Sequence, residues 1–289
     1  MGRRTILQIL NEAKVVLPKE YDRLYELFCE REYQHNFGNK KTLRNHCAEY
    51  FMSNPIRGTC VSLSDFEQTY GFRFAKNSPV LIPAEKHLDL LLYFCEYSYN
   101  LSYYSQQIVV KNLYTPVSTM DYHPIKDYLQ QVLTVIDKIG YMPIISDGIT
   151  SFVPKDQVAI SVAGTLDNTL SYRLIDYNHH SMKGDIKRKR ETLLALADKL
   201  EAEEKKLKQI NAPLDDDLFF MLNNLDIRHN NRGEGGKYYK PFVAIMAPEE
   251  LEKWYDEVYQ VCLLAFMELE HAPRKRTIAE LKKNINNTK

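Results

Sequence analysis

One segment of the chain brings a guanidinium and an imidazole together at positions that could act on a phosphate. Residues 223–232 read Asn-Asn-Leu-Asp-Ile-Arg-His-Asn-Asn-Arg. His229 continues the helical spacing of Leu218, Leu222 and Leu225, so the pattern predicts that it extends the inward face of a helix. Polar groups at the inner end of a core helix are costly unless they find partners. The pattern therefore suggests a polar site at a helix–helix interface.

Arg228 lies at the edge of the same predicted face, four residues after Asn224. A guanidinium can bind a phosphate through two parallel hydrogen bonds, and an imidazole can act as a general acid or base near neutral pH. Arg228 and His229 are therefore the candidate catalytic residues, with Asn224 and Asn230 as further polar candidates. The alternative is structural: Arg228, His229 and Asn230 would cap the last carbonyls of the helix.

A second candidate site is a basic run at the predicted start of a long helix. Residues 183–190 hold five basic residues and one acid. Cations at a helix N-terminus are repelled by the positive end of the helix dipole. A phosphate bound there would be attracted both by the cations and by the amides of the helix N-terminus. The predicted nucleic-acid-binding residues are Lys183, Lys187, Arg188, Lys189, Arg190 and Arg232. The alternative is a solvated charged face.

Histidines and cysteines give little sign of a metal site. His179 and His180 are adjacent, and adjacent residues on a helix do not face one another, so an interface or capping role is favoured. The cysteines are Cys29, Cys47, Cys60, Cys95 and Cys262, with no Cys-x-x-Cys pair. This spacing argues against a disulfide framework and against a zinc site built on thiolates. We expect buried free thiols, no metal and no cofactor.

Composition limits the class of protein. The 289 residues include 38 Lys plus Arg and 38 Asp plus Glu, and this neutral balance argues against a protein that coats nucleic acid by charge alone. The 11 glycines are few for this length, which disfavours turn-dense β architectures. No run of about 20 apolar residues could span a bilayer, and the N-terminus is too polar for a signal peptide. We expect a cytoplasmic protein with no membrane partner.

Hydrophobic periodicity predicts helices along most of the chain. The predicted helices cover 5–17, 21–33, 39–53, 85–104, 124–139, 155–163, 169–177 and 185–209, one led by Asp215–Asp217, and one opened by Pro248 with Trp254 facing inward. Ser64 and Glu67 fit a capping box that would start another helix. Asp147-Gly148 lies between two β-branched runs and predicts a small hairpin or an irregular linker at 141–153.

We therefore predict an all-α, multi-helix bundle, with that hairpin as its one β element. A domain boundary near the hairpin separates an N-terminal helical region, 1–145, from a C-terminal helical domain, 146–272. A charged tail, 273–289, follows the second domain.

The order of elements in the C-terminal half resembles the HEPN superfamily, most closely the helical C-terminal domains of bacterial abortive-infection proteins. A long amphipathic helix, an acid-led helix ending in Leu-x-x-Arg-polar, a Gly-rich loop and a closing helix carry this resemblance over Thr169–Leu269. Family members carry Arg, a polar residue, and then a His four to six residues after the Arg. Arg228 and His229 match the first two positions, whereas positions 232–234 are Arg, Gly and Glu.

The resemblance implies a function as well as a fold. Catalytic members of the superfamily cut RNA without a metal and usually act as dimers. We therefore expect an RNA-directed bacterial protein of the phage-defence type, possessing metal-independent ribonuclease activity and forming a homodimer. The alternative is a non-catalytic helical interaction or sensor module that keeps the fold without the nuclease chemistry.

Overall fold

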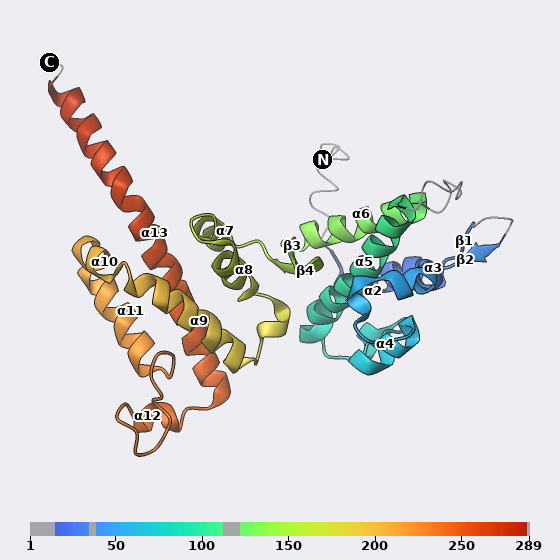
Figure 1. Ribbon diagram of the computed structural model, residues 1–289, viewed down its shortest axis with the longest axis horizontal. Helices are drawn as coiled ribbons and strands as arrows, with labels where there is room; N and C mark the ends of the chain where they lie inside the picture. The colour runs from blue at the N-terminus through green and yellow to red at the C-terminus, as the bar shows by residue number, and fades with distance from the viewer. Residues whose placement is uncertain (1–14, 35–38, 112–121, 288–289) are drawn as a thin grey trace, which may run out of the picture. The chain divides into compact units, whose positions relative to one another are not determined.

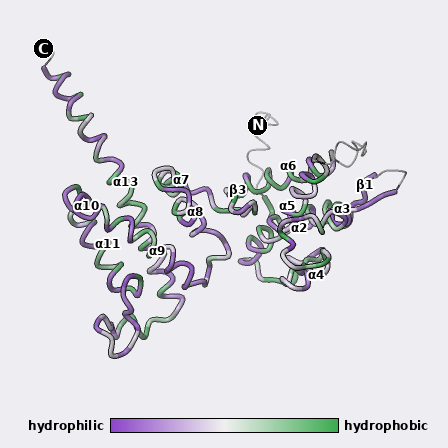
Figure 2. Tube along the Cα trace, in the orientation of Figure 1, coloured by the Kyte–Doolittle hydropathy of each residue, from purple (hydrophilic) through white to green (hydrophobic). Residues whose placement is uncertain are grey.

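The computed structural model describes residues 15–34, 39–111 and 122–287, and its chain divides into two compact units (Figure 1). The first unit is Met1–Pro154 and the second is Lys155–Lys289. Both are mainly helical, as predicted, and hydrophobic and hydrophilic residues alternate along their helices (Figure 2). Among the described residues, no helix combines the length and apolar character needed to cross a membrane.

The first unit is built around one long helix, α5. Its α-helices are α2 Leu17–Tyr25, α3 Leu43–Tyr50, α4 Leu63–Tyr70, α5 His87–Lys111 and α6 Tyr122–Lys138. Short helical turns lie at Glu26–Glu30, Phe51–Ser53, Pro55–Arg57, Ser78–Leu81 and Ala84–Lys86. Helices α2, α3 and α6 pack on α5, which buries Leu91, Phe94 and Leu101 completely. This aromatic-rich core is separate from the core of the second unit.

The described strands form two antiparallel pairs, both in the first unit. A two-residue pair joins β1 Tyr33–Gln34 to β2 Lys40–Lys41. The predicted hairpin is confirmed: β3 Tyr141–Ser146 pairs with β4 Ile149–Pro154. Asp147 and Gly148 both have positive φ, 50° and 80°, which is the geometry of the tight turn that suits twisted strands.

The hairpin is fixed to α5 by two polar side chains. Asn100 donates to the carbonyl of Thr150 and accepts from its amide, each at 2.8 Å, and Glu96 accepts from the amide of Phe152 at 2.8 Å. The hairpin therefore belongs entirely to the first unit, and the division of the chain falls after Pro154 rather than at the predicted 145/146.

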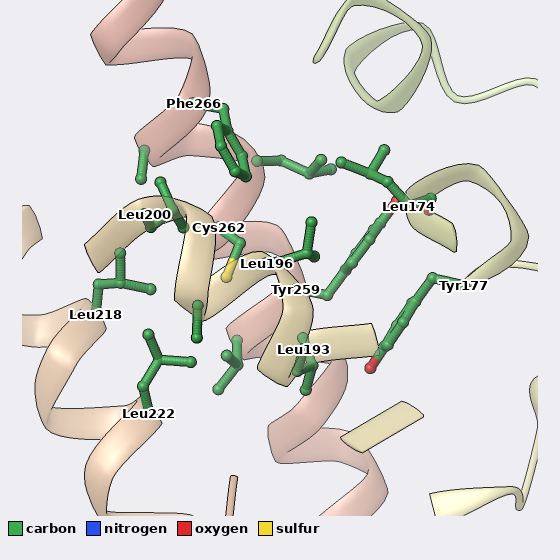
Figure 3. Close-up of a cluster of buried hydrophobic side chains, with 14 of the residues drawn as sticks. Leu174, Tyr177, Leu193, Leu196, Leu200, Leu218, Leu222, Tyr259, Cys262 and Phe266 are labelled. Carbon is green, nitrogen blue, oxygen red and sulfur yellow. Dashed lines mark hydrogen bonds between the residues drawn. The ribbon is translucent and has the colours of Figure 1, made fainter. Parts of the chain in front are cut away.

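The second unit packs its helices around α9 and α13. Its helices are α7 Gln157–Ala163, α8 Asn168–Asp176, α9 Ile186–Glu201, α10 Glu204–Ile210, α11 Ala212–Asn224, α12 Pro241–Ala244 and α13 Pro248–Asn287, with a short turn at His180–Met182. Leucines of α9 and α11 meet Tyr259, Cys262 and Phe266 of α13 in the buried cluster of Figure 3.

Several predicted elements change in the structure. The helix predicted at 185–209 is two helices, α9 and α10, because the chain turns at Ala202 and Glu203. The predicted inward position of Trp254 is wrong, since its side chain is 42% exposed. The segment predicted as a helix at 39–53 forms α3 and a short turn, and α3 starts only after Thr42, whose side chain caps it. Most of the helix predicted at 5–17 lies outside the described residues.

The predicted capping box at Ser64 is also wrong, because the cap lies two residues earlier. Ser62 Oγ accepts from the amide of Asp65 at 3.1 Å, and the Asp65 carboxylate accepts from the amide of Val61 at 2.8 Å. Glu67 is therefore free of the helix start and bonds elsewhere.

The last helix, α13, continues well past its packing partners. Its last core residue is Leu269, and from Pro273 to Asn287 every residue with a described side chain is exposed. The predicted charged tail is thus helical up to Asn287.

Candidate functional site

The segment that carries the candidate catalytic residues is not a continuation of α11. The helix ends at Asn224, and Asp226 takes a left-handed conformation with φ 60°. Ile227, not His229, is the residue that enters the core, with no exposed surface. The prediction that His229 extends the inward helical face is therefore wrong, because the backbone reverses at Asp226.

A reciprocal pair of hydrogen bonds closes this loop. The Asp226 amide donates to Asn231 Oδ1 at 2.7 Å, and the Asn231 amide donates to Asp226 Oδ1 at 2.9 Å. Asn231 is fully buried, and its Nδ2 donates to the carbonyl of Tyr238 at 2.8 Å. The loop between α11 and α12 is thus held by its own side chains.

Arg228 and His229 have different partners within this loop region. Arg228 forms an ion pair with Glu201 at the end of α9, Nη2 to Oε2 2.5 Å, and its guanidinium lies over the ring of Phe219. The His229 ring stacks on Tyr238 with centroids 4.0 Å apart and an interplanar angle of 9°. The Arg228 guanidinium, which would hold a phosphate in a nuclease, is here neutralised by a carboxylate.

The basic run at 183–190 separates into buried and exposed members. Lys189 is only 6% exposed, and its Nζ lies 2.8 Å from Glu252 and 2.7 Å from Asp256, both on α13. Arg188 pairs with Asp176 at 3.0 Å, and Arg190 donates to the carbonyl of Asp226. These three cations are used in holding α9 to its neighbours.

The ion pair between Lys189 and Glu252 affects the pKa of Glu252. Burial alone would raise the pKa of Glu252, but hydrogen bonds from Lys189 and from the amide of Gly184, 2.8 Å away, outweigh it and lower that pKa. Glu252 is therefore a carboxylate that stabilises the start of α9. Among the predicted nucleic-acid-binding residues, Lys183 is exposed and Lys187 is exposed with only a 4.0 Å contact to Glu191.

The remaining candidates cap turns or bond backbone carbonyls. Arg232 donates to the carbonyl of Met246 at 3.2 Å, and Asn230 Oδ1 accepts from the amide of Gly233 at 2.8 Å. Asn224 donates to the carbonyl of Phe220 at 2.7 Å, one turn back in α11. The capping alternative predicted that Asn230 bonds the last carbonyls of the helix, whereas its side-chain oxygen accepts from the amides of Arg232 and Gly233 in the following loop.

The two adjacent histidines also have a structural setting. His179 Nδ1 accepts from the amide of Ser181 at 3.2 Å and so caps the turn at His180–Met182. The rings of His179 and His180 lie 4.3 Å apart. All five cysteines are free thiols and four of them are buried, as predicted.

Sequence reasoning missed a charged cluster in the first unit. Arg44 of α3 donates Nε and Nη2 to the two carboxylate oxygens of Glu67 of α4, at 2.9 and 2.5 Å, and the Tyr97 hydroxyl of α5 donates to the same carboxylate. The only sequence signal was Glu67 itself, which the capping-box prediction assigned to its own helix end. Nothing in the spacing of Arg44 and Tyr97 pointed to this contact.

Comparisons with protein-family models, curated proteins and solved structures found no match for this chain. The HEPN resemblance therefore stays a prediction from the sequence.

Proposed function

We propose that this chain is a cytoplasmic, non-catalytic helical interaction protein that forms a homodimer through its second unit. The observation that carries the proposal is the exposed end of α13, residues 273–287, called the α13 tail below. It has an apolar stripe with no packing partner among the described residues, and an apolar groove of matching character lies on the same unit.

The α13 tail is an amphipathic and basic helix. Ile278, Leu281 and Ile285 follow each other at steps of three and four and are 44%, 57% and 64% exposed. Residues at this spacing form one stripe on a helix. The sequence of the tail contains five cations, Arg274, Lys275, Arg276, Lys282 and Lys283, against one acid, Glu280. An apolar stripe beside cations suits a groove that is apolar with an acidic rim.

The groove lies between α11, α12 and the start of α13. It has a volume of about 330 Å³ and is lined mainly by apolar side chains. Phe220, Phe242 and Trp254 line it and are 67%, 68% and 42% exposed, which is unusual for large aromatic residues. We call this the aromatic groove.

Exposed carboxylates lie on the same helix faces as two residues of the aromatic groove, Phe220 and Trp254. Glu250 and Glu257 lie four residues before and three residues after Trp254, and Asp217 lies three residues before Phe220, so each shares a helix face with a groove residue. Lys240 also lines the groove. In the part of the chain that the structure describes, none of the three acids forms an ion pair, so they are free to meet the cations of a tail.

The tail that fills the groove comes from a second copy. Ile278 lies 24 positions after Trp254 on one continuous helix, roughly 36 Å at 1.5 Å per residue, so the tail does not reach its own groove. Two copies related by a two-fold axis, with their α13 helices antiparallel, would bring each tail to the groove of the other. Such an arrangement contains two equivalent contacts and closes as a dimer.

The contacts of Arg228 favour this proposal over a ribonuclease. A guanidinium that already pairs with Glu201 must give up that carboxylate before it binds a phosphate. The proposal therefore takes Arg228 as a structural residue that joins the loop after α11 to the end of α9.

The test is the mass of the protein in solution, measured by light scattering during gel filtration. The wild-type chain is expected to be a dimer, and Leu281→Asp, which puts a carboxylate in the apolar stripe, is expected to be a monomer. The matched control is Leu81→Asp, because Leu81 is 83% exposed in the first unit. A monomeric wild type, or a Leu281→Asp variant as dimeric as the control, would contradict the proposal.

A further inference from the structure

The first unit contains a polar pocket beside the Arg44–Glu67 ion pair. Its volume is about 470 Å³, within the range of pockets that hold small ligands. Arg44, Glu67 and Arg73 give it charge, and aromatic side chains form its walls. All of the lining residues come from the first unit, far in sequence from the aromatic groove and the α13 tail.

The pocket has a net positive charge. Glu67 is fully engaged, since Arg44 donates to both of its oxygens and Tyr97 to one. The hydrogen bond to Glu67 raises the pKa of Arg44 above its already high value, so Arg44 stays charged. Arg73 is exposed and has no ion-pair partner in the described ranges 15–34, 39–111 and 122–287. Glu67 neutralises Arg44, so Arg73 is the cation that remains available for a ligand.

Aromatic rings line the same space. Phe72 and Tyr97 have ring centroids 5.1 Å apart, and Phe74 and Tyr97 have centroids 5.0 Å apart. Tyr25 also lines the pocket. Aromatic rings close to a guanidinium favour a flat ligand ring, because such a ring can stack on them while its charged group meets the cation.

The thiol in the pocket is not a nucleophile. Burial raises the pKa of Cys29 to about 12, so the side chain is a neutral thiol at physiological pH. A neutral thiol neither attacks an electrophile nor binds a metal efficiently. The pocket is therefore suited to binding rather than to covalent chemistry.

We infer that this pocket binds a small molecule that joins a flat aromatic ring to one anionic group, with Arg73 pairing the anion and Phe72, Phe74 and Tyr97 contacting the ring. Arg44 stays with Glu67 and sets the position of the pocket wall. The anion is a carboxylate in an aromatic acid or a phosphate in a nucleoside monophosphate, and the same chemistry recognises both.

Calorimetric titration of the full chain distinguishes an aromatic acid from a nucleoside monophosphate as the ligand. Phenylacetate and its neutral analogue phenylacetamide form one pair of probes, and adenosine monophosphate and adenosine form the other. Acetate and inorganic phosphate supply the anion without a ring. At least one ringed anion is expected to bind more tightly than both its neutral analogue and its ringless anion, and the better of the two identifies the source. If neither ringed anion binds, or if the neutral analogue binds as well, the inference is overturned.

The variant Arg73→Gln tests the role of the free cation. Loss of one charged partner should weaken binding of the ringed anion roughly 10- to 100-fold, with little change in binding of the neutral analogue. Arg31→Gln is the matched control, because Arg31 is exposed, pairs with Glu26 at 3.7 Å and does not line the pocket. Equal binding by the two variants would overturn the assignment. The result is independent of the mass of the protein, so it can fail while the dimer proposal holds.

Discussion

Replacing Lys189 with methionine should destabilise the second unit, although methionine keeps most of the apolar stem. The change removes the cation that lies 2.8 Å from Glu252 and 2.7 Å from Asp256. Breaking a fully buried pair costs roughly 3–5 kcal/mol, and losing an exposed pair costs about 0–1 kcal/mol. The Glu252 side chain is 16% exposed and the Asp256 side chain 51%, so this cluster lies between those limits. We expect a loss of about 2 kcal/mol.

The assay is urea unfolding followed by tryptophan fluorescence. Trp254 is the only tryptophan of the chain and lies on α13, so the signal reports the second unit. The control is Lys187→Met on the same helix, whose side chain is 87% exposed and should change stability by less than about 0.5 kcal/mol. Equal midpoints for the two variants would refute the assignment of Lys189 as a buried structural cation.

The ion pair between Lys189 and Glu252 makes the folded state less stable at acid pH. The pKa of Glu252 is lowered in the folded state from its ordinary 4.5, so its carboxylate stabilises the fold above pH 4.5. That contribution disappears as the pH falls through the lowered folded pKa. The stability difference between wild type and Lys189→Met should therefore narrow below pH 4.5. A difference that widens there would contradict a lowered pKa of Glu252 in the folded state.

The remaining predictions concern the corrected helix start and the ribonuclease hypothesis. Ser62→Ala should cost about 1 kcal/mol of stability in thermal unfolding followed by circular dichroism, because it removes the cap of α4, whereas Ser64→Ala should change little. Total RNA incubated with the protein in EDTA should remain intact for wild type and for Arg228→Ala/His229→Ala alike. Cleavage by the wild type that the double variant lacks would instead support a metal-independent ribonuclease.

Local signals in the sequence predicted much of the secondary structure. Asp147-Gly148 defined the hairpin because only a few residue pairs adopt its positive φ angles readily. Gly140 lies two residues after the end of α6 and has a positive φ of 81°. Glycine is common just after a helix because it adopts this left-handed conformation without strain. Such features depend on residues that are close in the chain, which is why a single sequence reveals them.

Contacts between distant residues were not predictable in the same way. Lys189 stands in a basic run that resembles a solvated face, yet it is buried because its two acids lie on α13, more than 60 positions away. The left-handed turn at Asp226 depends on Asn231, and it moves His229 off the helical spacing that suggested its role. Charge and periodicity therefore identified the polar segments but not their partners.

Docking of the α13 tail in the aromatic groove of a second copy is tested by mixing two variants that are each expected to be monomeric. Leu281→Asp has a damaged tail and an intact aromatic groove, whereas Phe242→Asp has an intact tail and a damaged groove. Light scattering should show each variant as a monomer alone and a dimer in the equimolar mixture, because one tail–groove contact is restored. A mixture that stays monomeric, or a Phe242→Asp protein that is dimeric by itself, would contradict docking of the α13 tail in the aromatic groove of a second copy.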